Sequence, residues 1–164
     1  MLKKTTEVEK PDLAFLPEYI QTRIRNIFDK YLMLGLQDRS SVEGNLPQFP
    51  NKFSALSSNE AGDIHMKYAA WTDYASGKLK YLKTAQTVLS FEKNKAFKQA
   101  LSKQTGNVTE RKILAETDEV YLSVLEYETD LNALVEMVEK EVEALDKQVM
   151  AIRAELRRKE NTPR

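Results

Sequence analysis

The last third of the chain carries a regular spacing of apolar positions. From Val124 to Leu156, apolar residues recur at steps of three and four. This spacing is typical of a long amphipathic helix that packs one narrow seam against other helices. We expect this seam to join copies of the chain. The residues expected at that interface are Leu131, Leu134, Val138, Val142, Leu145, Val149, Ile152 and Leu156.

A second helical segment precedes this one. Ser57 and Glu60 have the spacing of a capping box, in which two side chains satisfy free N–H groups in the first turn of a helix. From Ile64 to Leu89, apolar residues again recur at helical spacing. The sequence therefore predicts a long helix that begins at about residue 57.

A short turn separates the two long segments. Gly106 suits the left-handed position that follows many helix ends, and Asn107 with Glu110 repeats the capping-box spacing. The second helix is expected to run from about Val108 to Arg158. Two long helices joined by a tight turn predict an antiparallel helical hairpin.

The first 56 residues are expected to form an N-terminal arm. Residues 1–16 have the character of a flexible segment, residues 17–34 that of a short helix, and Pro47 and Pro50 lie in a connector. The expected fold class is thus all-α. It combines this arm with a long antiparallel hairpin over residues 57–164, whose C-terminal helix is coiled-coil-like and drives oligomerisation.

The net charge of zero conceals strong segregation of charge along the chain. Residues 67–112 hold ten basic and three acidic side chains, whereas residues 116–146 hold eleven acidic side chains and a single lysine. The tail from 147 to 164 is again basic. A basic block on one helix is typical of a polyanion site. It is equally compatible with a basic helix that simply pairs with the acidic helix that follows.

Aromatic residues lie between the lysines of the basic block, among them Tyr74, Tyr81, Phe91 and Phe97. Lysines neutralise phosphates, and aromatic rings can stack on unpaired bases. No base-reading motif is present, so binding is expected to tolerate any sequence. The candidate nucleic-acid-binding residues are Lys78, Lys80, Lys83, Lys93, Lys95, Lys98, Lys103, Arg111 and Lys112.

Signals for catalysis and cofactors are missing from the sequence. The chain has no cysteine, and its single histidine, His65, lacks a nucleophile or a di-iron spacing around it. We therefore expect neither an enzyme nor a bound cofactor or metal. No apolar run approaches the roughly 18 residues that a membrane span needs, and the N-terminus lacks a secretory signal. A cytoplasmic protein without membrane contact is expected.

Two consecutive stretches carry a family resemblance. The first, "YAAWTDYASGKLKYLKTAQTVLSFEKNKAFKQALSKQTG", is a basic helix approaching a turn, and the second, "NVTERKILAETDEVYLSVLEYETDLNALVEMVEKEVEALDKQVMAIRAEL", is an acidic helix with a basic end. In this layout, residues 57–160 resemble the UvsY-like recombination mediators of phages. The first 56 residues depart from that pattern.

The resemblance implies a helical homo-oligomer that binds single-stranded DNA in the host cytoplasm. Such mediators help to load a RecA-like recombinase onto strands covered by single-strand binding protein. DNA is carried in the family by basic residues near the helix end, which correspond here to Lys93, Lys95, Lys98 and Lys103, and the C-terminal helix drives assembly. The alternative from the residues alone is a structural or scaffolding coiled-coil protein of a phage or cell, with no nucleic-acid role.

Overall fold

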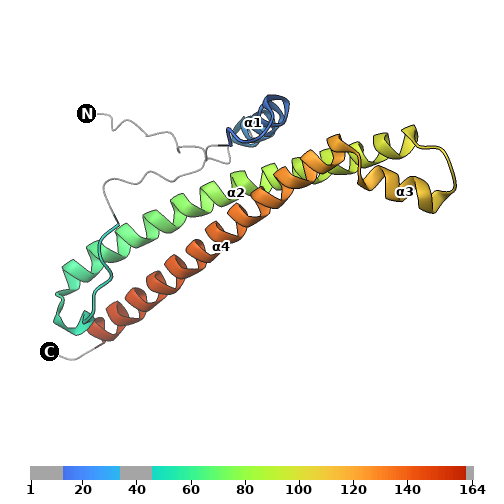
Figure 1. Cartoon of the computed structure of the whole chain (residues 1–164). Coiled ribbons are helices and arrows are strands. Elements are labelled where there is room, and N and C mark those ends of the chain that lie inside the picture. The colour runs from blue at the N-terminus through green and yellow to red at the C-terminus, as the bar shows by residue number, and fades with distance from the viewer. Residues whose placement is uncertain (1–12, 34–45, 162–164) are drawn as a thin grey trace. The chain divides into compact units, whose positions relative to one another are not determined.

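The structure, a computed structural model, describes residues 13–33 and 46–161. These residues form four α-helices and one 3-10 turn, and no strand occurs among them. The elements are α1 (Glu18–Met33), η1 (Phe53–Ala55), α2 (Ser58–Lys103), α3 (Val108–Glu116) and α4 (Glu119–Glu160) (Figure 1). The expected all-α fold class is confirmed.

The starts of α2 and α3 carry the expected capping boxes. The backbone N–H of Glu60 donates to Ser57 Oγ at 3.2 Å, and that of Ser57 donates to Glu60 Oε2 at 2.8 Å. Asn107 and Glu110 make the same reciprocal pair at 3.0 and 3.2 Å. Gly106, with φ +117°, occupies the left-handed region that favours glycine. These local predictions are confirmed.

The expectation of one unbroken helix from Val108 to Arg158 is wrong. The helix stops after Glu116, where the Thr117 hydroxyl donates to the carbonyl of Leu114 at 2.9 Å. Asp118 Oδ1 then accepts hydrogen bonds from the next helical turn, from the N–H groups of Val120 (3.0 Å) and Tyr121 (3.2 Å). Threonine and aspartate side chains compete for backbone groups in this way, so the pair ends α3 and caps α4.

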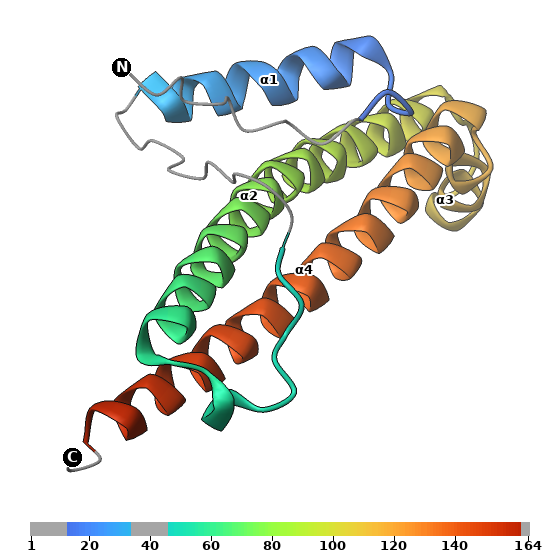
Figure 2. The ribbon, with the colours of Figure 1, turned by 90° about the vertical axis from the view of Figure 1, so that its left-hand side faces the viewer.

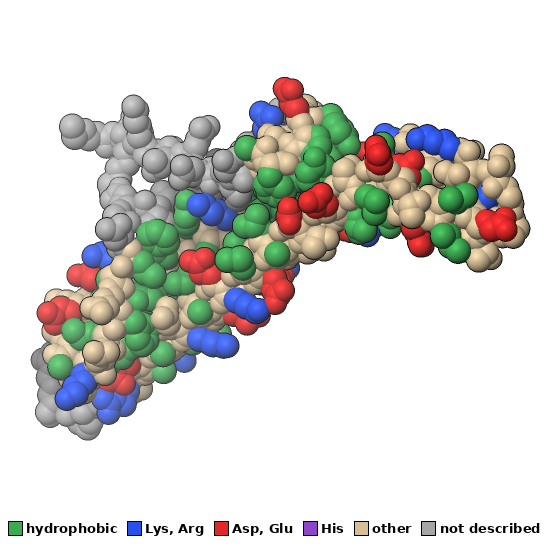
Figure 3. Space-filling model, in the orientation of Figure 1, with side chains coloured by type: hydrophobic (Ala, Val, Ile, Leu, Met, Phe, Trp, Pro, Cys, Tyr) green, Lys and Arg blue, Asp and Glu red, His purple; other side chains and the backbone are tan. Residues whose placement is uncertain are grey.

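The chain divides into two compact units. The first comprises, among the described residues, 46–79 and 137–161. In this unit α2 and α4 lie side by side (Figures 1 and 2), and apolar side chains follow the line where they meet (Figure 3). Its core consists of Tyr68, Ala75, Leu145 and Ile152, with Phe49, Phe53, Ile64, Val142, Val149 and Leu156 packed against them.

The described part of the connector belongs to this core. The ring of Phe49 lies 5.2 Å from that of Phe53 and 5.7 Å from that of Tyr68. The Tyr68 hydroxyl donates to the carbonyl of Pro47 at 2.8 Å. This aromatic cluster holds the segment before α2 against the helices. Figure 2 shows the path of that segment. The rest of the connector, residues 36–45, lies outside the described residues.

The second unit comprises described residues 13–33 and 80–136. In α1, Ile20 and Ile24 are fully buried. Leu13 and Leu16, in the segment expected to be a flexible arm, are buried as well, whereas residues 1–12 lie outside the described part. Each unit therefore combines residues from before and after position 56.

Candidate nucleic-acid interface

One face of α2 in the second unit points away from the core. Its members follow one another at steps of three and four and therefore share a helix face. We call this face the outer ridge, and it consists of Lys80, Thr84, Thr87, Phe91, Lys95, Lys98 and Ser102. The buried residues of the same stretch, including Leu82, Ala85 and Leu89, lie on the opposite face.

The hydroxyl groups of the outer ridge are satisfied by their own helix. Thr84 Oγ1 donates to the carbonyl of Lys80 at 3.0 Å, and Ser102 Oγ donates to that of Gln99 at 2.7 Å. Thr87 makes the equivalent bond, to the carbonyl of Lys83 at 3.1 Å. The groups left to meet a partner are the lysine ammonium groups and the ring of Phe91.

Phe91 is the exposed aromatic residue of this ridge. Its exposed fraction is 54%, and the guanidinium carbon of Arg23, from α1, lies 4.5 Å from its ring centroid. Two of the other aromatic residues that lie between the lysines, Tyr81 and Phe97, pack inside the protein or against another ring. Tyr81 is buried, which raises the pKa of its hydroxyl, and the ring of Phe97 lies 5.4 Å from that of Tyr121.

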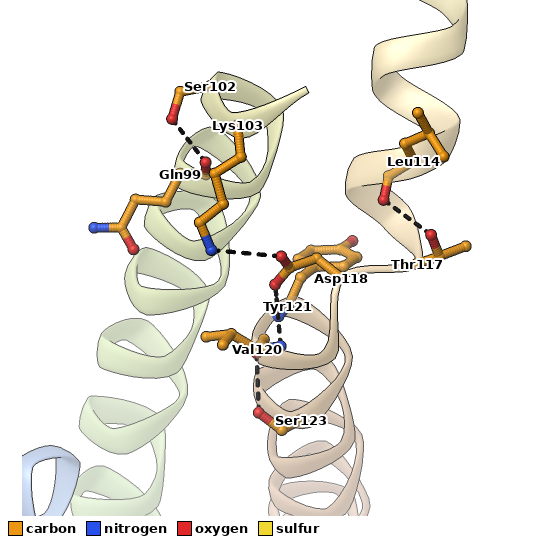
Figure 4. A network of polar contacts seen from close by, with 9 residues as sticks. All are labelled: Gln99, Ser102, Lys103, Leu114, Thr117, Asp118, Val120, Tyr121 and Ser123. Atoms are coloured by element: carbon orange, nitrogen blue, oxygen red, sulfur yellow. Dashed lines mark hydrogen bonds and ion pairs between the residues drawn. The ribbon is translucent and has the colours of Figure 1, made fainter. Parts of the chain in front are cut away.

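Two predicted DNA-binding lysines instead pair with acidic residues of the same unit. Lys93 Nζ lies 2.6 Å from Glu128 Oε2, and both side chains are largely buried. Lys103 Nζ lies 3.6 Å from Asp118 Oδ2 (Figure 4). The basic part of α2 is therefore partly neutralised by acidic residues of α4 and of the turn just before it, which is the alternative that the charge pattern left open.

Arg111 and Lys78 also have partners inside the protein. Arg111 Nη2 donates to the carbonyl of Leu101 at 3.1 Å, so its charge lies at the C-terminal end of α2, where cations are favoured. Its Nε is buried without a hydrogen-bond partner among the described residues. Lys78 Nζ, in the first unit, lies 4.4 Å from the ring centroid of Tyr74.

The remaining predicted basic residues are open to solvent. Lys80, Lys98 and Lys112 are exposed, and none of them forms an ion pair within the described residues. Lys83 is exposed on the flank of the ridge. Lys95 lies 3.6 Å from Glu92 Oε2, but its side chain is 55% exposed, so its charge is still available. The outer ridge thus keeps three accessible ammonium groups, those of Lys80, Lys95 and Lys98, on the helix face that carries Phe91.

Most of the residues of α4 that were predicted to form an interface between copies are buried or partly buried against other residues of the same chain. Leu131, Leu145 and Ile152 are buried, and Val138, Val142, Val149 and Leu156 are partly buried. Leu134 differs from them, with an exposed fraction of 37%. Periodicity identified the buried face of α4, but the side chains that cover it within the first unit come from the same chain.

Other kinds of site are not found in the described part of the chain. No group of three or more His, Cys, Asp or Glu side chains there could hold a metal ion. The described helices include none that is long and apolar enough to cross a membrane. His65, the sole histidine, is half-buried, and its Nε2 finds no hydrogen-bond partner among the residues that the structure describes.

Comparison with protein-family models, with curated proteins and with solved structures found no match to this chain. A function for this chain must therefore be inferred from its own residues, and those of the outer ridge offer the most specific chemistry. Their chemistry combines positive charge with one exposed ring on a single helix face.

Proposed function

We propose that this chain is a non-enzymatic protein that binds single-stranded DNA without sequence preference. The observation that carries the proposal is the outer ridge, where Lys80, Lys95 and Lys98 share one exposed helix face with the ring of Phe91. Ammonium groups attract phosphates, and an open ring offers a surface to any unpaired base. The absence of a base-reading motif from the sequence supports sequence-tolerant binding.

The role that we propose for this binding is that of a recombination mediator. The resemblance of residues 57–160 to UvsY-like mediators supports it, and so does the order of a basic helix followed by an acidic one. In this proposal α2 and α4 form an antiparallel hairpin, copies of which self-associate. Several ridges in one oligomer would bind a strand far more tightly than one, because the later contacts become intramolecular. A RecA-like recombinase and single-strand binding protein are the proposed protein partners.

A second candidate is a scaffolding protein with no nucleic-acid role. The ion pairs of Lys93 with Glu128 and of Lys103 with Asp118 favour it, because they use part of the basic block inside the protein. In a scaffolding protein, the exposed lysines of the basic block would only keep the helix surface hydrated and would bind no ligand. The two candidates differ in one measurable property, which is salt-dependent affinity for single-stranded DNA.

The deciding experiment is fluorescence anisotropy of a labelled oligo-dT over a series of salt concentrations. If three ridge lysines contact phosphates in each chain, log K should fall with log salt with a slope of about −2 per chain bound. The double variant Lys95→Glu, Lys98→Glu should lose binding without a change in oligomer size.

A matched control separates a local site from net charge. Lys147 and Arg153 are exposed on α4, in the first unit, and the variant Lys147→Glu, Arg153→Glu makes the same change in charge away from the ridge. The proposal expects this control to bind nearly as well as the wild type. Weak binding by the wild type at every salt concentration would discard the proposal and leave the scaffold.

A further inference from the structure

We propose that Phe91 is a stacking platform for one unpaired base and that Arg23 holds its ring in place. This inference rests on the proposed function and deepens it, because it names the ridge residue that distinguishes single strands from duplexes. Phe91 is large, apolar and more than half exposed, yet its neighbours along the ridge are lysines and hydroxyl residues. An isolated exposed apolar residue is common on proteins, so the argument depends on what surrounds this ring.

The surroundings of Phe91 restrain its position. The Arg23 guanidinium lies over the ring, and its Nη1 also forms an ion pair with Glu92, whose side chain is almost completely buried. Glu92 therefore anchors Arg23, and Arg23 in turn packs on Phe91. A ring that is already held in place loses less conformational entropy when a ligand binds to it. Arg23 acts through Phe91 and is a positioning residue.

The position of Phe91 also matches the chemistry of a nucleotide. Lys95 follows Phe91 by one helical turn and Lys98 by about two, so both ammonium groups lie along the same face as the ring. A base stacked on Phe91 would thus have its phosphates beside these lysines. The Arg23 guanidinium covers one face of the ring, so a base would stack on the other face.

Stacking on Phe91 requires a base that has left its own stack. Lysines alone attract the phosphates of single and double strands alike. The bases of a duplex are covered by their neighbours, so they cannot reach a ring on the convex surface of a helix. Phe91 therefore gives the outer ridge a preference for single-stranded DNA that its charge does not supply.

The test compares two ligands of equal charge, oligo-dT and an abasic deoxyribose-phosphate oligomer of the same length. For full-length Phe91→Ala, affinity for oligo-dT should fall about 5- to 150-fold, the range for losing one stacked base. Affinity for the abasic oligomer and the salt slope should stay near the wild-type values. Phe91→Trp retains a ring and should restore oligo-dT binding. Arg23→Gln should weaken oligo-dT binding more than binding of the abasic oligomer, because it frees the ring in addition to removing one positive charge.

The outcomes separate this inference from the proposed function. If the wild type does not bind oligo-dT, both are wrong. If it binds and Phe91→Ala binds equally well, or loses the same factor on both ligands, the stacking inference alone is wrong. Circular dichroism of each variant checks the fold. Should Phe91→Ala prove misfolded, quenching of a 2-aminopurine base by the wild type decides instead, and its absence would overturn the stacking inference.

Discussion

The ammonium group of Lys103, the last residue of α2, lies 3.6 Å from Oδ2 of Asp118, the residue directly before α4 (Figure 4). The other carboxylate oxygen of Asp118 caps α4 by accepting the backbone N–H groups of Val120 and Tyr121. The Asp118 carboxylate thus caps the first turn of α4 after the break in the helix. It also neutralises Lys103, which is one of the candidate nucleic-acid-binding residues predicted from the sequence. Because the cap needs an oxygen and the ion pair needs a charge, mutation can separate these roles.

Replacing Asp118 by asparagine should keep the cap and remove the charge, since asparagine is an equally good N-cap residue. We expect the free energy of unfolding of Asp118→Asn to stay within about 1 kcal/mol of the wild type, because the Lys103 side chain of the ion pair is 62% exposed to solvent. Affinity for oligo-dT should rise by up to about fivefold, because Lys103 is released. Urea denaturation and anisotropy measure the two effects.

The companion variant Asp118→Ala loses both roles. It should destabilise the protein by about 1 kcal/mol more than Asp118→Asn, the usual cost of a lost N-cap. Equal stabilities of the two variants would show that the cap contributes nothing at this position. Unchanged oligo-dT affinity in both would remove Lys103 from the binding surface.

Arg111 and Lys112 are neighbours in α3, and we expect their replacement to affect the stability of the protein to different extents. Arg111 donates to the carbonyl of Leu101, so Arg111→Gln should lower the free energy of unfolding by about 1.5–3 kcal/mol, the range for a hydrogen bond from a charged group. Lys112 is exposed, and Lys112→Gln should stay within about 0.5 kcal/mol of the wild type. Urea denaturation of both variants checks this order, and the reverse order would contradict the role assigned to Arg111.

How much of the fold the sequence predicts depends on the range of the interactions involved. The capping boxes at Ser57 and Asn107 were predictable because each is made within one helical turn. The break at Thr117 and Asp118 was missed, although this residue pair carries a cap signal. The apolar spacing resumes beyond it and hides the interruption.

Burial and accessibility were harder to predict from the sequence. Periodicity identifies Leu145 and Ile152 as buried, but it does not tell whether the same chain or a copy covers them. Charge identifies Lys93 and Lys98 alike, and only the packing of α2 against α4 shows that Lys93 faces Glu128. The one available signal for Phe91 was its position, at helical spacing from Lys95 and Lys98 rather than from the buried Leu89.

The capping box of α2 predicts a pH dependence of stability. Hydrogen bonds from the backbone N–H and the hydroxyl of Ser57 hold the pKa of Glu60 below its ordinary value of 4.5. A carboxyl with a lowered pKa in the folded state contributes stability above its unfolded pKa. It loses that contribution as pH falls through the folded pKa. Stability due to Glu60 should therefore be complete at pH 7, begin to fall near pH 4.5, and disappear only below the lowered pKa of the folded state.

Glu60→Gln isolates this effect, because glutamine resembles the protonated carboxyl. The wild type should melt at a higher temperature than Glu60→Gln at pH 7, and the difference should shrink as the pH falls below 4.5 and through the lowered pKa of Glu60. Melting followed by circular dichroism at intervals of half a pH unit measures it. A difference that stays constant across this range would show that the charge of Glu60 does not stabilise the cap.

Leu145 and Leu134 provide the clearest test of what the apolar seam of α4 does. Leu145 is buried in the core of the first unit, so Leu145→Ala should cost about 2–5 kcal/mol and Leu145→Asp should unfold that unit. Leu134 is 37% exposed, so Leu134→Asp should leave the fold intact. If copies associate through the exposed side of α4, Leu134→Asp should also dissociate the oligomer. Sedimentation of both variants measures the size of the oligomer, and circular dichroism measures whether the helices are still folded. An oligomer unchanged by Leu134→Asp would show that this leucine is outside the interface, whereas a folded Leu145→Asp would contradict the core described here.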